Sequence, residues 1–189
     1  MQQLFNGNID IYYGQFYIDD IDAEADSDSL DSDVVDDDSL LDVDSAFAQQ
    51  LNGLCGACHL GRLFFIAEPQ EGVAHVAVEL HTEEPPLLEH SDDVVECSFA
   101  ARSNSLHLCE WANEATYPLS LPLGDYICRY SICATDSEYK DDETWRQPLA
   151  GQHFIIQFWP GKLAQDRIVV ANSQKGHYWH KTLGVTPEH

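Results

Sequence analysis

Short segments in which apolar and polar residues alternate recur along most of the chain, and this spacing constrains the fold more than any other feature. The alternation has a period of two residues and is clearest over residues 74–80, 126–132 and 154–158. The connections between such segments are mostly short, and stretches with helical periodicity are nearly absent. We therefore expect an all-β protein, an antiparallel β-sandwich of about eight strands with a short C-terminal tail that is helical or irregular.

The two ends of the chain are less regular than this central part. Residues 8–18 indicate a first strand in which the apolar positions change phase at Gly14, and this change predicts a β-bulge there. The tail, residues 162–189, contains Tyr178-Trp179-His180. Because large aromatic side chains favour burial, we expect these aromatic residues to pack back onto the body of the protein.

One segment near the N-terminus differs in kind from the rest. Thirteen of the 26 residues from 19 to 44 are Asp or Glu, and none is Lys or Arg. Mutual repulsion and low hydrophobicity predict an extended or loosely ordered acidic loop here. After it, residues 45–52 predict a short helical turn that is capped by Asp44 or Ser45 and ended by Gly53.

The whole chain is strongly acidic, with 33 Asp and Glu against 9 Lys and Arg, a formal net charge of -24. A field of this sign repels nucleic acid and anionic lipid and attracts basic proteins. We therefore expect a basic protein partner, no nucleic acid and no membrane. The residues predicted to bind this partner are the aspartates of the acidic loop: Asp26, Asp28, Asp31, Asp33, Asp36, Asp37 and Asp38. The alternative is that the acidity serves solubility alone.

Length and the absence of targeting signals suggest a simple organisation. A chain of 189 residues suits one domain spanning 1–189. Residues 1–18 have neither a basic start nor an apolar stretch of the signal-peptide type, and no apolar run reaches the ~20 residues of a membrane span. We expect a cytoplasmic protein whose six cysteines are reduced and mostly packed in the core.

The sequence Cys55-Gly-Ala-Cys58-His59 matches the haem-attachment pattern and supplies three potential zinc ligands. Covalent haem belongs outside the cytoplasm, and the single methionine at position 1 leaves no internal Met as an axial ligand. A zinc site would need Cys97 or Cys109 as a further ligand, and no second paired-ligand motif is present. We therefore expect no cofactor and expect the cysteines to pack at a strand entrance. A haem or zinc protein using Cys55, Cys58 and His59 remains the alternative.

Other motifs that carry chemistry do not occur. The aspartates of the acidic loop lack the Gly and Glu that an EF-hand requires at its sixth and twelfth positions. The nucleophile elbow, the phosphate-binding loop, the dinucleotide fingerprint and the zinc-protease motif are likewise missing. The sequence therefore predicts a protein that is not an enzyme.

Several segments resemble known families. The turn Leu121-Pro-Leu-Gly-Asp-Tyr126, the strand Phe154–Pro160 and the terminal Tyr178-Trp-His180 are similar to those of uncharacterised bacterial β-sandwich proteins. The opening Ile9–Tyr17 and the Leu-Pro-x-Gly-Asp-Tyr turn resemble the competence protein J family of nuclease inhibitors. The resemblance extends over about two thirds of the chain and its motifs are mainly structural. It implies an inhibitor or immunity protein that neutralises a basic enzyme such as a nuclease. A generic sandwich interaction module is the other alternative.

Overall fold

The computed structural model describes residues 1–20, 43–67, 70–133 and 153–185, and strands dominate these ranges. The predicted all-β class is therefore confirmed. The elements in chain order are β1 (Gln2–Tyr12), β2 (Gln15–Asp20), α1 (Val43–Ala46), β3 (Cys55–Gly56), β4 (Leu63–Ile66), β5 (Glu71–Leu80), β6 (Asp93–Ala101), β7 (Leu106–Cys109), the 3-10 helix η2 (Trp111–Asn113), β8 (Thr116–Pro118), β9 (Gly124–Cys133), β10 (His153–Pro160), β11 (Arg167–Ala171) and α2 (Gln174–Leu183).

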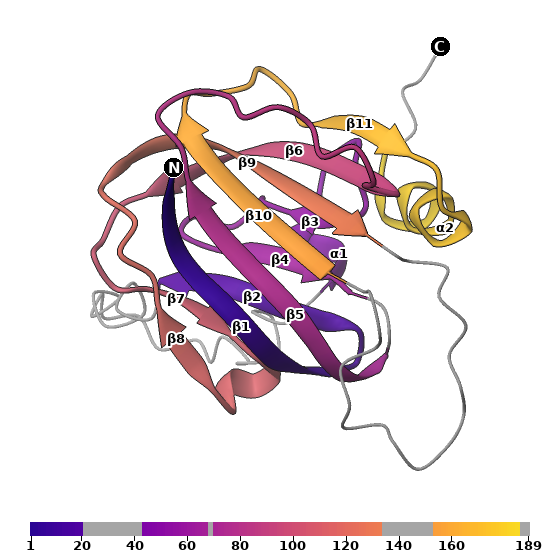
Figure 1. Cartoon of the computed structure of the whole chain (residues 1–189). Coiled ribbons are helices and arrows are strands. Elements are labelled where there is room, and N and C mark those ends of the chain that lie inside the picture. Colours follow the sequence, from indigo (N-terminus) through magenta and orange to yellow (C-terminus); the bar gives the residue numbers. More distant parts are fainter. Residues whose placement is uncertain (21–42, 68–69, 134–152, 186–189) are drawn as a thin grey trace, which may run out of the picture.

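The strands of the described residues form one sheet of eleven strands that curls on itself (Figure 1). The order is β11-β6-β9-β10-β5-β1-β2-β4-β3, and β7 and β8 extend the sheet from β2. Most neighbours are antiparallel, but β5 and β10 run parallel, with Val76 beside Phe154. The antiparallel sandwich of about eight strands is thus corrected to a curled mixed sheet. Alternation identifies a strand but not its neighbour, and β3 is too short to show any alternation.

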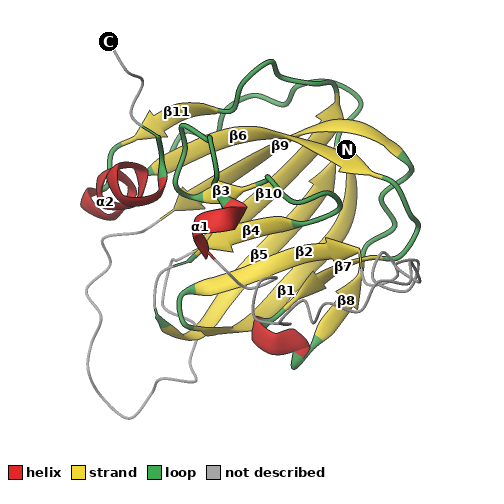
Figure 2. Ribbon diagram, turned by 180° about the vertical axis from the view of Figure 1, so that it is seen from behind, coloured by secondary structure: helices red, strands yellow, loops and turns green. Residues whose placement is uncertain are grey.

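The curl places β2 and β4 against β9 and β10, so the core lies between two parts of the same sheet (Figure 2). Phe16 lies 5.7 Å from Phe154, and Phe65 lies 4.9 Å from Tyr130, measured between ring centroids. The Tyr130 hydroxyl donates a 2.8 Å hydrogen bond to the Ile66 carbonyl and so has a partner inside the core. Each aromatic pair contributes about 0.5–1.5 kcal/mol beyond the area that it buries.

The first strand ends in a tight hairpin, where the sequence had predicted a bulge. β1 and β2 are antiparallel, and Tyr12 pairs with Gln15 across a two-residue turn. Tyr13 and Gly14 both have positive φ values, 56° and 64°, as a type I′ turn requires. The change of apolar phase at Gly14 therefore marks a reversal of chain direction, after which a new strand begins.

The helical turn predicted for residues 45–52 is displaced. Helix α1 covers Val43–Ala46, and the rest of the predicted segment is irregular. The amide groups of Leu51 and Asn52 donate to the carboxylate of Asp166, at 2.9 and 2.7 Å, instead of to helical carbonyls. A long-range carboxylate therefore determines this local structure, and the local sequence could not reveal it.

The C-terminal tail is more ordered than predicted. It contributes the edge strand β11, which pairs with β6, and the ten-residue helix α2. The expected packing is confirmed for Trp179, which lies against the core, whereas Tyr178 is 59% exposed. No helix in the described ranges has the length and apolar character needed to cross a bilayer.

Candidate functional site

The predicted partner-binding aspartates, from Asp26 to Asp38, lie outside the described residues. The residues at the borders of the acidic loop belong to the folded body. Asp19 on β2 accepts a 3.0 Å hydrogen bond from Nε of Arg62, and Asp20 is buried.

An aromatic pair, the exposed Tyr13 and the half-buried Trp111, lies where the β1–β2 hairpin meets η2. The rings of Tyr13 and Trp111 lie 4.9 Å apart with an angle of 49° between their planes. Tyr13 is 64% exposed although it is a large aromatic residue. Tyr13, Ala112 and Asn113 have φ values of 56°, 51° and 56°, a region that residues other than glycine seldom occupy. Strained backbone of this kind is concentrated at functional sites.

Several acidic residues lie on the chain segments next to this aromatic pair. Glu71 is the cross-strand partner of Tyr12, and Asp10 lies on the exposed side of β1. Oε1 of Glu110 accepts hydrogen bonds from the amide of Asp10 and from the hydroxyl of Tyr117, both at 3.0 Å. Burial raises the pKa of Glu110, and the nearby negative charges of Asp10 and Glu114 raise it further. We call this set the aromatic–acidic patch: Asp10, Tyr13, Glu71, Glu110, Trp111 and Glu114.

The chemistry of the patch suits a cationic group. The face of a Tyr or Trp ring attracts Lys and Arg side chains, and surrounding carboxylates strengthen that attraction. Tyr and Trp are also the residues that most often dominate binding energy at protein interfaces. Sequence reasoning missed this patch because Tyr13 and Trp111 are almost one hundred residues apart. The sequence did contain one signal for the patch: Tyr12 and Tyr13 directly precede Gly14, a residue type typical of tight turns, where side chains are often exposed.

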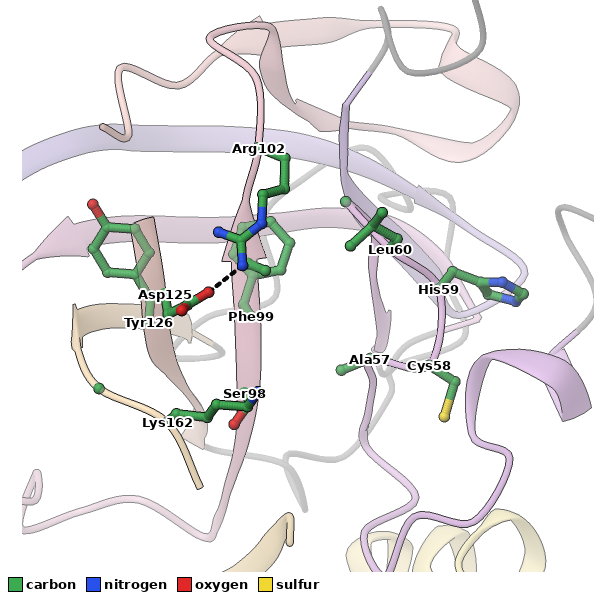
Figure 3. A pocket seen from close by; sticks show the side chains of 13 residues that line it. Ala57, Cys58, His59, Leu60, Ser98, Phe99, Arg102, Asp125, Tyr126 and Lys162 are labelled. Carbon is green, nitrogen blue, oxygen red and sulfur yellow. Dashed lines mark hydrogen bonds and ion pairs between the residues drawn. The ribbon is translucent and has the colours of Figure 1, made fainter. Parts of the chain in front are cut away.

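A separate pocket of about 330 Å³ lies between the segment after β3 and the strands β6 and β9 (Figure 3). Phe99 and Tyr126 form part of one wall, together with Arg102 and Asp125, which form an ion pair at its edge. Lys162 projects from the segment after β10, and no carboxylate of the described residues lies within salt-bridge distance of it. The pocket therefore combines an apolar wall with a lysine.

The opposite wall contains Cys58 and His59 of the Cys-x-x-Cys-His motif, and these two side chains have separate partners. The thiol of Cys58 donates to the carbonyl of Ala48 at 2.7 Å, and Nε2 of His59 lies 3.0 Å from Oγ of Ser45. Burial raises the pKa of Cys58, which reduces the fraction of reactive thiolate. Figure 3 shows the sulfur of Cys58 and the ring of His59 pointing in different directions.

The predicted ligand set of Cys55, Cys58 and His59 is not brought together. Cys55 is completely buried, whereas Cys58 is exposed. Among the described residues, the ligand atoms of Cys55, Cys58 and His59 do not lie close enough together to hold one metal ion. β3 begins at Cys55, so the backbone turns Cys58 and His59 away to the surface. Sγ of Cys55 instead lies 3.5 Å from Sγ of Cys97, which was one of the two further zinc ligands considered. The other, Cys109, donates to the His107 carbonyl and lies outside that sulfur group.

The fold and its surface define a β-rich protein with a curled mixed sheet and an acidic character. The structure resembles ComJ from Bacillus subtilis, an inhibitor of the DNA degrading activity of NucA, with 14% identity and a TM-score of 0.49 over 85% of this chain and 98% of ComJ. It also resembles a protein described as crocagin biosynthetic gene J, with 17% identity and a TM-score of 0.46 over 86% of this chain and all of the other. The resemblance to the competence protein J family that the motifs indicated is therefore found in the structure as well. No protein-family model matches the chain, and no curated protein matches it.

Proposed function

We propose that this chain is a non-catalytic acidic binding protein that recognises a basic protein, and that it acts as an inhibitor or immunity protein. The observation that carries the proposal is the contact between the exposed Tyr13 and the half-buried Trp111, with acidic residues on the neighbouring positions of the same elements. A partner that places an Arg or Lys over these rings gains a cation–π contact worth about 0.5–2 kcal/mol, depending on how fully water is excluded. The neighbouring acidic residues favour the same cation.

The charge of the body supports a cationic partner. All four arginines of the described residues already pair with carboxylates, which neutralises much of the positive charge of the body. These pairs are Arg62 with Asp19, Arg102 with Asp125, Arg129 with Glu84 and Glu96, and Arg167 with Glu96. Few cations therefore remain to offset the carboxylates of a chain whose net charge is -24.

A nuclease is the partner class that this chemistry suits best. A nuclease must present cations to phosphate groups, and an acidic protein surface can occupy those cations in place of nucleic acid. Opposite fields also accelerate capture, toward roughly 10⁸–10⁹ M⁻¹s⁻¹ at low salt. The acidic loop, with Asp26, Asp28, Asp31, Asp33, Asp36, Asp37 and Asp38, extends the surface available for this contact in our proposal.

The test uses the full chain and a basic nonspecific endonuclease, with the rate of DNA degradation and the dissociation constant as the two measurements. We expect Trp111→Ala to weaken binding about tenfold or more, because interface aromatic residues often contribute over 1.4 kcal/mol. Tyr178→Ala is the matched control, since Tyr178 is exposed on a different element. Equal losses in the two variants, or no loss in Trp111→Ala, would contradict the role of the patch.

The charge contribution has its own test. We expect replacement of the seven loop aspartates by Asn to weaken binding at low ionic strength and to reduce its dependence on salt. Substitution is preferable to deletion of residues 19–44, because Asp19 and Asp20 belong to β2 and Val43 begins α1. A dissociation constant that does not change with salt would favour apolar recognition by a generic interaction module. A chain that leaves DNA degradation unaffected would exclude the inhibitor role.

A further inference from the structure

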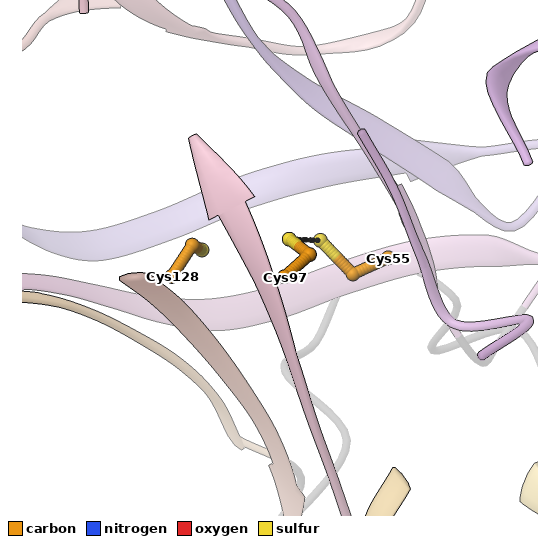
Figure 4. Close-up of side chains that lie close together, drawn as sticks. All are labelled: Cys55, Cys97 and Cys128. Atoms are coloured by element: carbon orange, nitrogen blue, oxygen red, sulfur yellow. Dashed lines mark hydrogen bonds between the residues drawn. The ribbon is translucent and has the colours of Figure 1, made fainter. Parts of the chain in front are cut away.

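Three cysteine sulfurs meet in the core, at a place that none of the proposed functions uses. Cys55 on β3, Cys97 on β6 and Cys128 on β9 place their Sγ atoms within 4.8 Å of one another. All three residues are buried, and Figure 4 shows Cys97 between the other two. The closest pair is Cys55 and Cys97, whose sulfurs are 3.5 Å apart.

The fold holds each of these residues in place by means that do not depend on the sulfurs. Cys97 and Cys128 are direct cross-strand partners of β6 and β9. The backbone of Cys55 is held on both sides: its amide donates to Oδ1 of Asn52 at 2.7 Å, and its carbonyl accepts from Nε2 of Gln50 at 3.0 Å. Both amide side chains are themselves buried. The three thiols are therefore preorganised by strand pairing and by a buried hydrogen-bond network.

We propose that Cys55, Cys97 and Cys128 form a binding site for a soft monovalent metal cation of the Cu(I) class. A metal bonded to three coplanar sulfurs at about 2.3 Å separates those sulfurs by about 4 Å. The observed separations, from 3.5 Å to at most 4.8 Å, include this value. The site is distinct from the partner surface and does not rest on the proposed function.

The donor set discriminates between metals. Thiolate sulfur prefers soft cations such as Cu(I) and zinc, but structural zinc almost always has four ligands. Within the described residues the group contains three sulfurs and no histidine or carboxylate. A cation that accepts two or three sulfurs therefore fits better than zinc.

The surroundings allow the site to exist with and without metal. Without metal, Cys55, Cys97 and Cys128 pack with the buried apolar residues of the core. Binding of the cation displaces thiol protons, which leave to solvent, and no electron is transferred.

The test titrates the reduced full chain with Cu(I) in the absence of oxygen, in competition with a colorimetric Cu(I) chelator. We expect one Cu(I) per chain, near-ultraviolet sulfur-to-copper absorption, and X-ray absorption with sulfur neighbours alone. Cys97→Ala and Cys128→Ala should each weaken Cu(I) binding at least about tenfold. Cys109→Ala and Cys133→Ala are the controls and should bind like the wild type, because these two cysteines lie outside the group.

Folding is checked separately, because the substituted positions lie in the core. Circular dichroism and thermal unfolding of each variant without metal show whether the β structure is retained, and Cys97→Ser supplies a second variant of nearly the same size. The X-ray absorption measurement needs no variant at all. Failure to compete with the chelator, nitrogen or oxygen neighbours, preference for Zn(II), or a Cys55–Cys97 disulfide in freshly isolated protein would each overturn the proposal.

Discussion

Arg129 donates a 2.8 Å hydrogen bond from Nε to Oε1 of Glu96, and both side chains are buried. The two residues are cross-strand partners on β9 and β6. Arg129 also donates to the carbonyl of Pro85 at 2.7 Å and lies 4.8 Å from the centre of the Trp159 ring. Oε2 of Glu96 accepts a second hydrogen bond, at 2.7 Å, from Arg167 on the edge strand β11. One buried carboxylate thus connects three adjacent strands.

We expect Arg129→Met to lower the free energy of unfolding by about 3–5 kcal/mol, because it leaves Glu96 charged in the core with one partner fewer. The double variant Arg129→Met, Glu96→Gln should lose less than the single variant, since it removes the uncompensated charge as well. Arg102→Met is the matched control: its pair with Asp125 is half exposed, so it should cost less than about 1 kcal/mol. Urea unfolding measures all three. A double variant that is less stable than Arg129→Met would contradict this account.

A second prediction concerns Gly176, which lies in helix α2. Asp93 accepts hydrogen bonds from the amide and hydroxyl groups of Ser173, the N-cap of α2, and the Ser173 hydroxyl accepts from the amide of Gly176 at 2.8 Å. A Cβ atom at position 176 would collide with the buried carboxylate of Asp93. Gly→Ala in a helix normally stabilises it by about 1 kcal/mol. Here we expect Gly176→Ala to destabilise the protein instead.

Thermal unfolding checks the sign of this effect. His177→Ala, at the next and exposed position of the same helix, is the control and should change stability by less than about 0.5 kcal/mol. An unchanged or higher melting temperature for Gly176→Ala would show that Asp93 can move away from α2.

Much of the β structure could be predicted from the sequence, because its cause is local. The alternating residues of β5, β9 and β10 identify these strands directly. The parallel pairing of β5 with β10 could not be predicted, since it joins segments about eighty residues apart. The same is true of the irregular segment at Leu51 and Asn52, whose amides bind Asp166 from the far end of the chain.

For the candidate sites too, local patterns could be predicted from the sequence and long-range contacts could not. The Cys-x-x-Cys-His motif is a local pattern, and it suggested a set of ligands that the fold separates: Cys55 points into the core while Cys58 and His59 lie at the surface side of the turn. The sulfur group that does form needs Cys128, which follows from the pairing of β6 with β9. Register across a sheet, which single-sequence patterns do not give, decides which cysteines meet.

A third prediction concerns pH and His180 on helix α2. Nδ1 of His180 accepts a hydrogen bond from the amide of Gly53 at 3.1 Å, and burial lowers the pKa of the imidazole below its ordinary value of 6.5. Protonation would turn Nδ1 into a donor facing another donor. Because the unfolded chain takes up this proton first, stability is lost as pH falls below about 6.5 toward the lowered pKa.

Chemical unfolding of the wild type at pH 7.5 and at successively lower values measures this loss, and His180→Gln should show a smaller decrease over the same interval. The glutamine carbonyl can accept from Gly53 but does not titrate. His90→Gln is the control, because His90 is exposed. A pH profile that is the same for wild type and His180→Gln would assign the loss to other groups.

The last prediction separates stability from binding at Tyr13. Its φ of 56° places a bulky residue in the left-handed region, at a cost of about 1–3 kcal/mol, whereas Asn followed by Gly is favoured in a type I′ turn. The contact with Trp111 that Tyr13→Asn removes is worth about 0.5–1.5 kcal/mol. The relief of strain is the larger quantity, so we expect Tyr13→Asn to raise the free energy of unfolding by up to about 2 kcal/mol.

Binding of the basic endonuclease to Tyr13→Asn should weaken at the same time, because the exposed ring is lost. Tyr178→Asn, on helix α2, should leave binding unchanged. A Tyr13→Asn variant that is more stable and binds as well as the wild type would show that the strained tyrosine has no role in recognition.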